Sequence, residues 1–420
     1  MIISFGTKEI EKIWNGERVK KIPIEIQKNR RRKLRMLNSP YVCNLKSSGD
    51  HINLVPRTKN LTDMDKTKQL DFTGQDIYIG LDTHLRNWRV TIMVNDSPYK
   101  TFSQDPRTEV LKNYLTRTFP NGNYYSAYEA SFSGFNIHRE LVSLGVKNIV
   151  VNPADIPTTD KERKQKEDSR DSRKIARELS QKDLTPIYIP EIEIEGDRCL
   201  IRYRKTLTKE IARAKNRVKS QLYYFGIEIP ACFSGKDYWS KKFTAWLQSV
   251  ELPNNSAKMA LDAHLEMAEM LRKKQYSTNK EIRKLSEKEI YKYNYHLLIS
   301  VPGIGTLTAM IILTELGDIK RFKNLDKLCS FIGLVPTTNS SGESERTGGV
   351  TVRQNKILRT TIIESSWIAI RHDPALMLAY QKLIKRMEAQ KAIIRIAKKL
   401  VSRIMYVLKN KQPYVHAVIK

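Results

Sequence analysis

The chain has 420 residues, of which 40% are apolar, so it is long enough for two or three domains and can bury real cores. Lysine and arginine outnumber aspartate and glutamate by 74 to 45, and the resulting formal charge of +29 favours a polyanionic partner. The four cysteines have no CxxC spacing, which argues against a disulfide scaffold and a cysteine-based zinc module.

We expect the sequence to carry no signal for export or for a membrane. Its first residues, MIISFGTKEIEK, lack a basic region followed by an apolar one, so we expect no secretory signal. The longest apolar runs, such as residues 308–313, are far shorter than the roughly 20 residues that span a bilayer. We therefore expect an intracellular protein in a reducing compartment, with no membrane partner.

Residues 1–75 differ in composition from the rest and form an N-terminal extension. The segment is strongly basic around Lys28–Arg35, and a short helix is predicted over Ile24–Leu37. Residues 39–69 show no sustained period of two or of 3.6, which is typical of irregular structure or a linker.

Residues 76–195 are predicted to form an α/β domain. The predicted elements follow one another as strand, strand, strand, helix, strand, helix and strand. They cover residues 76–82, 87–94, 98–103, 103–119, 123–131, 135–145 and 146–153. This order fits a mixed α/β sheet, and it matches the order of RNase H-like domains.

The remainder of the chain is predicted to be mainly helical. Residues 196–298 contain long charged helices with a narrow apolar seam, as in Leu207–Leu222, which is typical of a coiled coil or helical hairpin and often of dimerisation. A single long helical pattern runs over Ser256–Leu298. Residues 299–420 predict a compact α-helical domain that ends in the basic helix Lys391–Leu408.

Four acids stand where a metal site would need them. Asp82 ends the first strand, Glu129 ends the fourth, and Asp168 and Asp171 lie three residues apart on one face of a predicted helix. Carboxylate oxygens suit Mg²⁺, and a pair of such ions can stabilise the attacking and leaving oxygens of a phosphodiester displacement. The alternative is structural: a strand-ending Asp can form a turn, and the helical pair can balance a neighbour such as Arg173.

The segment VPGIGTLTA, residues 301–309, resembles part of a helix–hairpin–helix element. Gly303 and Gly305 permit a tight turn whose backbone N–H groups, at the start of the next helix, are predicted to clamp a phosphate. The alternative is an ordinary glycine-rich connection between helices.

A polar segment, TTNSSGESERTGG at residues 337–349, is predicted to be a long loop. Such a loop inside a compact domain is either functional or merely mobile. A serine there can attack phosphorus if a base or a metal assists its deprotonation. No histidine lies in the segment, and His372 downstream is better interpreted as the end of a helix.

Taken together, these motifs resemble a known family. IGLDTH, YEAS, KEDSRDSRKIA, VPGIGTLTA, GLVPTTNSSG and NKILRTTIIESSW occur in the order found in the DEDD transposases of the insertion-sequence family numbered one hundred and ten. These proteins are also described as bridge-RNA-guided recombinases. The resemblance covers residues 76–410 and rests on two separate blocks.

The resemblance implies an RNase H-like (RuvC-like) α/β domain, a helical coiled-coil insert and a mainly α-helical C-terminal transposase domain. It assigns Asp82, Glu129, Asp168 and Asp171 as catalytic, Mg²⁺-binding acids and Ser341 as the nucleophile, with Ser340 a weaker candidate. The implied chemistry is strand exchange through a covalent phosphoserine. The active site would combine acids from one protomer with the serine of another, in a homodimer or homotetramer.

The same resemblance implies the partners. These are target DNA, donor DNA and a structured guide RNA encoded by the element, in the nucleoid of a prokaryotic cytoplasm. No organic cofactor is expected. The residues expected to contact nucleic acid are Gly303, Gly305, Arg346, Arg353, Asn355 and Arg359.

The first block, ISFGTKEIEKIWNGERVKKIPIEIQKNRRRKLRML, more faintly resembles the N-terminal half of a HigB/RelE-like toxin. The sheet that would complete such a toxin has no counterpart in the sequence. We therefore interpret residues 1–75 as a fusion remnant without ribonuclease activity.

Two alternatives to an RNA-guided recombinase remain open. One is a RuvC-like, metal-dependent nuclease or resolvase that uses the acids alone, with water as the attacking group. The other is a non-enzymatic nucleic-acid-binding protein in which the acids are structural. The basic helices 202–219 and 391–403 are expected to contact phosphates in each case.

Overall fold

The structure is a computed structural model that describes residues 71–157, 168–233, 238–341 and 344–415, together with Lys12 and Asn15. For residues 168–169, 338–341 and 344–347 it describes the backbone but not the side chains. The helix predicted over Ile24–Leu37 lies outside these residues, as does nearly all of the toxin-like segment.

The chain divides into two compact units. One unit comprises residues 1–74 and 116–122, and the other comprises residues 75–115 and 123–420. In the described part of the first unit, the backbone N–H of Phe72 donates to Pro120, 2.9 Å away, and the rings of Phe72 and Phe119 meet edge to face at 5.1 Å. All other elements discussed below belong to the second unit, apart from the last residues of α3.

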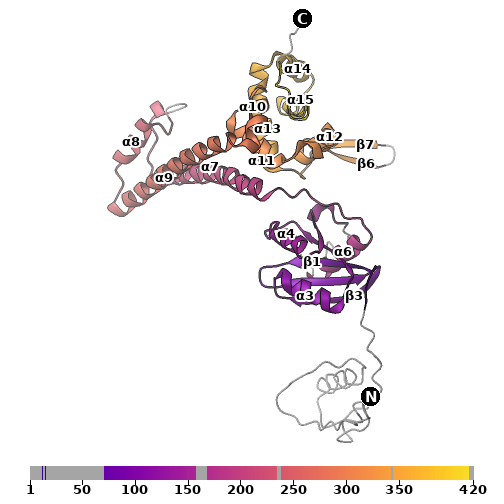
Figure 1. Cartoon of the computed structure of the whole chain (residues 1–420). Coiled ribbons are helices and arrows are strands. Elements are labelled where there is room, and N and C mark those ends of the chain that lie inside the picture. Colours follow the sequence, from indigo (N-terminus) through magenta and orange to yellow (C-terminus); the bar gives the residue numbers. More distant parts are fainter. Residues whose placement is uncertain are drawn as a thin grey trace, which may run out of the picture. The chain divides into compact units, whose positions relative to one another are not determined.

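The second unit contains a five-stranded mixed sheet, which confirms the predicted α/β character of this part of the chain (Figure 1). The strand order is β3-β2-β1-β4-β5; β1, β2 and β3 run antiparallel to one another, and β4 and β5 continue parallel to β1. The predicted succession of strands and helices is confirmed. The elements are β1 (Asp76–Thr83), β2 (Trp88–Val94), β3 (Ser97–Gln104), α3 (Thr108–Thr118), β4 (Asn123–Glu129), α4 (Asn136–Ser143) and β5 (Lys147–Val151).

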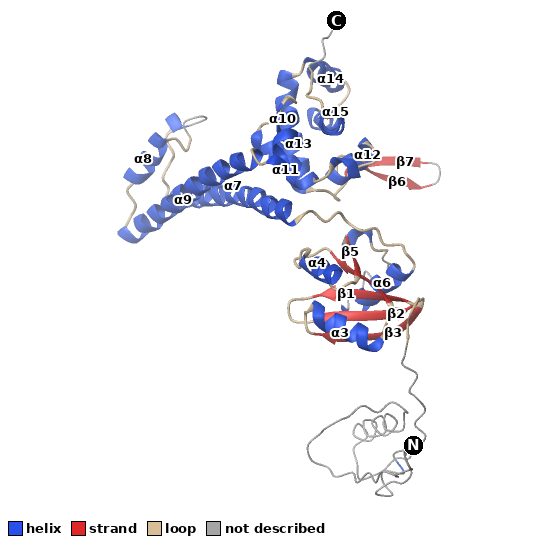
Figure 2. Cartoon of the chain, viewed as in Figure 1, coloured by secondary structure: helices blue, strands red, loops and turns tan. Residues whose placement is uncertain are grey.

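Helices cover both faces of this sheet (Figure 2). Helix α6 (Asp168–Ser180) packs on the face that carries Tyr78 and Ala127, where its residues Ile175 and Leu179 join a buried apolar cluster. On the opposite face, the hydroxyl of Tyr124 donates to a carbonyl of α3. Because both faces are covered, most residues of β1 and β4 are buried whichever face they point to.

A helical hairpin follows, as the sequence predicted. Helices α7 (Ile192–Tyr224) and α9 (Asn255–Ser286) lie side by side and antiparallel, because Thr208 of α7 bonds Gln275 of α9 while Gln221 bonds Ala257. The short helix α8 (Lys241–Ser249) packs against the distal end of the pair. The predicted helix over Ser256–Leu298 is interrupted at Glu287 and Lys288, where α10 (Glu289–Ile299) begins.

The C-terminal part is mainly helical and encloses the largest buried apolar cluster of the described residues. Its helices are α10, α11 (Thr306–Leu316), η4 (Ile319–Arg321), α12 (Leu325–Ile332), α13 (Lys356–His372), α14 (Pro374–Ile384) and α15 (Ala389–Asn410). Strands β6 (Pro336–Ser341) and β7 (Ser344–Val350) form a separate hairpin. No helix in the described ranges has both the length and the hydropathy that a membrane crossing requires.

Candidate active site

The ends of β1 and β4 place two acids next to each other. Leu81 pairs with Tyr128 across the parallel ladder, and Asp82 and Glu129 are the next residue on each strand. Since paired strands lie about 4.8 Å apart, the two carboxylates leave the backbone at neighbouring points. Asp82 is partly buried, with 19% of its side chain exposed.

Both acids project to the face that α6 covers. Alternate residues of a strand share a face, so Asp82 shares one with Gly80, and Glu129 shares one with Ala127. Helix α6 crosses directly over Gly80, because a Cβ there would lie 2.1 Å from the carbonyl oxygen of Ser172. Ala127 lies in the buried cluster that α6 forms with the sheet. Only glycine, which has no Cβ, allows α6 to pack this closely on β1, and this glycine lies two residues before Asp82.

The first turn of α6 brings two further acids to this region. Ser172 and Ile175 are buried against the sheet, and the Ser172 hydroxyl contacts that of Thr91 on β2 at 2.9 Å. Asp168 and Asp171 occupy positions four residues before Ser172 and Ile175. Because residues four apart lie on one stripe of a helix, the two acids extend the sheet-facing stripe by one turn.

The surroundings of Asp82 are polar. His84 approaches its carboxylate at 3.1 Å from Nε2 to Oδ2, and Arg89 stands opposite it on β2. The Arg89 guanidinium donates to the hydroxyl of Ser103 at 2.8 Å. Next to Glu129, burial raises the pKa of Tyr128 to about 12, and its hydroxyl donates to the carbonyl of Gly134. Tyr128 therefore stays protonated at neutral pH and fixes the loop that follows β4.

Carboxylate oxygens at the strand ends have the donor chemistry that hard divalent cations take. Among the side chains that the structure describes, however, no three acids, histidines or cysteines gather as a metal-binding group. The side chain of Asp168 is not among them. The fold thus brings the backbone positions of the four predicted acids to one face, and the described carboxylates do not by themselves complete a metal site.

The predicted serine loop is wrong as a loop, because this segment forms the hairpin β6–β7. Its ladder pairs Ser340 with Glu345 and Ser341 with Ser344, so Ser341 is the last residue of β6 at the hairpin tip. Apart from Pro336, Val350 and the two glycines of β7, both strands consist of polar residues, so they have no apolar alternation for sequence reasoning to detect.

The root of this hairpin is tied to the helical core. Thr351 donates its backbone N–H to Val335, and Thr337 donates its hydroxyl to Gly349 at 3.0 Å. Gly333, with φ at 88°, ends α12 so close to Gln354 that a Cβ would lie 2.4 Å from that side chain. The hairpin is therefore anchored at its base, while Ser341 stands at its far end.

The predicted phosphate clamp has a packing role in this structure. Gly303 has φ at 85°, and a Cβ there would lie 2.5 Å from the Ser365 carbonyl on α13. Gly305 is exposed and precedes the first residue of α11, and a Cβ on it would meet no atom within 4 Å. Only Gly305 therefore presents an open backbone of the kind that a phosphate could approach.

Four residues beyond the two glycines are predicted to contact nucleic acid, and the side chains of three of them form hydrogen bonds or ion pairs within the protein. Arg353 forms an ion pair with Asp155. Asn355 caps α13, accepting from the backbone N–H groups of Ile357 and Leu358. Arg359 donates to the carbonyl of Thr351 at 2.7 Å. The side chain of the fourth, Arg346, is not described.

Sequence reasoning missed the buried carboxylate of Glu315. It accepts two hydrogen bonds from Arg202 on α7 and one from Asn355. Burial by itself raises the pKa of Glu315, but the hydrogen bonds from Arg202 and Asn355 outweigh it and hold the pKa below its ordinary value. The sequence signal that could have predicted such a pair is a single acid within the mainly apolar helix TLTAMIILTEL.

Two profiles of known protein families match the chain. Residues 79–225 match the DEDD transposase profile of the IS110 type, and residues 295–381 match the profile described as "Transposase IS116/IS110/IS902 family". The first match contains the strand ends and α6, and the second contains the serine hairpin and α13. Together the two matches span more than half of the chain.

Curated relatives point the same way. The protein y4qE of Sinorhizobium fredii is 28% identical over 67% of this chain and 66% of its own length. The protein y4rJ of the same organism is 29% identical over 77% of this chain and 89% of its own. The transposase for insertion sequence element IS1533 of Leptospira borgpetersenii is 26% identical over 59% of this chain and 72% of its own.

The fold, the strand-end acids and these matches define a transposase of an insertion sequence. More narrowly, the chain belongs to the IS110/IS116 family of DEDD transposases.

Proposed function

We propose that the chain is a DNA recombinase of its insertion sequence that cuts and rejoins strands through Ser341, assisted by the acids of an RNase H-like, RuvC-like domain. The observation that carries the proposal is the strand register that sets Asp82 beside Glu129 on the face covered by α6. Two carboxylates at neighbouring points repel each other, and a bound cation would relieve that repulsion. A formal charge of +29 supports a nucleic-acid substrate.

The proposed reaction has two balanced steps. The Ser341 oxygen forms a bond to phosphorus while the bond from phosphorus to the leaving DNA oxygen breaks, and the serine proton ends on that leaving oxygen. The reverse attack by a hydroxyl of another strand releases the serine and joins the new pair. Magnesium held by Asp82, Glu129, Asp168 and Asp171 would neutralise charge developing on the phosphate.

Two further features are part of the proposal. A structured RNA encoded by the element would select target and donor DNA by base pairing. The acids and the serine would meet between protomers of a dimer or tetramer. The position of Ser341 at the tip of a hairpin that is anchored at its base supports a serine that is delivered to another surface.

The proposal is tested by measuring whether the protein forms a covalent adduct with labelled DNA in the presence of magnesium. Ser341→Ala should abolish the adduct, and Ser340→Ala, one residue earlier on the same strand, should retain it. Retention of the adduct in Ser341→Ala would eliminate this serine as the nucleophile. Free strand ends without any adduct would instead identify a metal-dependent nuclease, in which water attacks.

The composite site and the guide RNA have separate tests. Mixing Ser341→Ala with Asp82→Asn should restore part of the adduct if different protomers supply the serine and the acids, and should restore none if one protomer supplies both. Purification of the protein with its flanking element, followed by sequencing of bound RNA, should recover one structured transcript. Recovery of only random cellular RNA would contradict guidance.

A further inference from the structure

The distal end of the helical hairpin carries cations that form no ion pair with a described carboxylate. Lys215 and Lys219 lie one turn apart on α7, and Arg272 lies on the adjacent helix α9. Within the described residues, none of the three belongs to an ion pair, whereas Lys273 and Lys284 on α9 pair with glutamates. These three cations therefore leave positive charge in this part of the hairpin that no described ion pair neutralises.

Two aromatic rings hold the lysines in place. The Lys215 ammonium lies 4.8 Å from the ring centre of Trp239, and the Lys219 ammonium lies 4.7 Å from that of Tyr238. The rings are themselves packed on Phe243, at 5.4 and 5.0 Å between ring centres. Because a cation over an aromatic face is attracted to it, both ammonium groups are ordered before any ligand arrives.

The backbone at this point is strained. Trp239 has φ at 67°, in the left-handed region that a bulky side chain rarely adopts. Such a conformation is unfavourable for a bulky side chain and persists only where the surrounding contacts impose it. Here the contacts with Phe243 and Lys215 fix the ring at the surface of the hairpin.

Lys215 is also repelled by each of the other two cations. Burial lowers the pKa of Lys215, and the nearby charges of Arg272 and Lys219 lower it further. An anion bound among them would remove this repulsion. The protein thus keeps, at some cost, an ordered cluster of positive charge that is well separated in the sequence from the acids and from Ser341.

We propose that Lys215, Lys219 and Arg272 form a binding site for the phosphodiester backbone of a nucleic-acid strand, distinct from the candidate active site. The inference rests on the proposed function in taking nucleic acid as the polyanion. Guide RNA and DNA present the same phosphate chemistry to these groups, and the experiment below separates them. The site would fix a strand along the hairpin while the strand-end acids and the serine act elsewhere.

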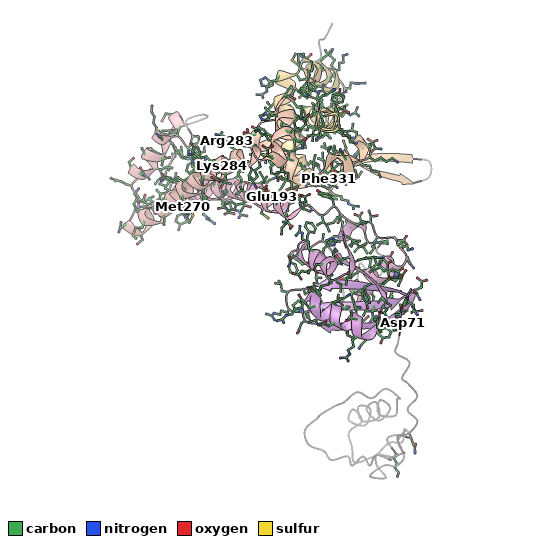
Figure 3. The ribbon with its side chains drawn as sticks, in the orientation of Figure 1. Asp71, Glu193, Met270, Arg283, Lys284 and Phe331 are labelled. Atoms are coloured by element: carbon green, nitrogen blue, oxygen red, sulfur yellow. The ribbon has the colours of Figure 1, made fainter. Side chains whose placement is uncertain are left out.

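The experiment compares two double variants of the full chain. Lys215→Gln/Lys219→Gln removes two charges from the proposed site. Lys273→Gln/Lys284→Gln removes two charges of the same hairpin that already have glutamate partners; Lys284 is labelled in Figure 3. Binding is measured by fluorescence anisotropy with a labelled 20-nucleotide RNA, the DNA of the same sequence and its duplex, over a series of salt concentrations.

We expect the first variant to bind about tenfold more weakly than the second near physiological salt. Its slope of log affinity against log salt should be shallower by about 1.4 with single strands and about 1.8 with duplex. The probe whose affinity falls most in the first variant identifies RNA or DNA as the natural occupant. Equal affinities and equal slopes for the two variants would overturn the site.

Two checks separate this result from a folding defect and from failure of the proposed chemistry. Lys215→Arg/Lys219→Arg keeps both charges and should bind like the unmodified protein; weak binding by this variant as well would assign the lysines a packing role only. The Ser341 adduct is assayed separately. Loss of the adduct in Ser341→Ala with unchanged strand binding would leave both inferences standing, each on its own measurement.

Discussion

The guanidinium group of Arg202 donates two hydrogen bonds to the carboxylate of Glu315, at 2.7 Å from Nε to Oε1 and 2.9 Å from Nη2 to Oε2. Glu315 is 1% exposed in its side chain, and it also accepts from Asn355, the residue that caps α13 just after the serine hairpin. One buried charge therefore connects the helical hairpin, α11 and the helix that begins beside β7.

Removing either partner of this pair should destabilise the protein, and by unequal amounts. Arg202→Ala leaves a buried carboxylate without its main partner, so we expect a loss of about 3 kcal/mol in the free energy of unfolding. Glu315→Gln leaves an arginine that is 52% exposed and can be solvated, so we expect a loss of about 1–2 kcal/mol. Urea unfolding measures both.

The surface pair on the same helix gives the control. Arg213 bonds Glu210, but its side chain is 65% exposed. Arg213→Ala should therefore change the free energy of unfolding by less than about 1 kcal/mol. A larger loss for Glu315→Gln than for Arg202→Ala would show that the burial of the carboxylate is not the deciding factor.

The same carboxyl should make stability depend on pH. Burial acts to raise its pKa in the folded protein, but the bonds to Arg202 and Asn355 outweigh burial and lower the pKa from the ordinary value of 4.5. A group whose folded pKa is lowered contributes stability above its unfolded pKa, and this contribution is lost as pH falls through the folded value. Thermal midpoints between pH 7 and pH 3 should fall less steeply for Glu315→Gln than for the unmodified chain. Parallel curves would contradict the assignment.

Gly80 should be indispensable to the acid-bearing face. In Gly80→Ala the new Cβ would lie 2.1 Å from the Ser172 carbonyl and 2.5 Å from the Ala176 nitrogen, so α6 must move away from β1. We expect a loss of about 2–3 kcal/mol in unfolding free energy, together with loss of the DNA adduct because the acids of α6 are displaced. The control, Gly196→Ala in α7, has open space and should stabilise by about 0.5–1 kcal/mol. Normal stability of Gly80→Ala would mean that α6 does not pack as described.

Two glycines of one motif should behave differently. Gly303→Ala places a Cβ 2.5 Å from Ser365 at a φ of 85°, so we expect a loss of about 2 kcal/mol or more. Gly305→Ala meets no atom within 4 Å and should cost less than about 1 kcal/mol. Thermal unfolding and DNA affinity, measured on both, separate packing from phosphate binding. Unaltered stability with weakened DNA binding in Gly303→Ala would instead support the predicted phosphate clamp at this glycine.

The sequence by itself determined the features that depend on local pattern. Alternating residues predicted the strands of the mixed sheet, and the seam Leu207–Leu222 predicted the helical hairpin, because periods of two and 3.6 are written in neighbouring residues. The charge of +29 and the four acids were likewise visible without a structure. The roles of the acids and of Ser341 remain predictions that the adduct experiments test.

Only the tertiary structure decided which distant residues meet. The ladder between β1 and β4 set Asp82 beside Glu129, the closeness of α6 explained Gly80, and the pairing of β6 with β7 turned a predicted loop into a hairpin. The bond between Arg202 and Glu315 joins residues 113 positions apart. Such contacts arise from packing between elements that are far apart in the sequence. The periodicity of neighbouring residues cannot predict them, because their free energy is gained only when the whole core assembles.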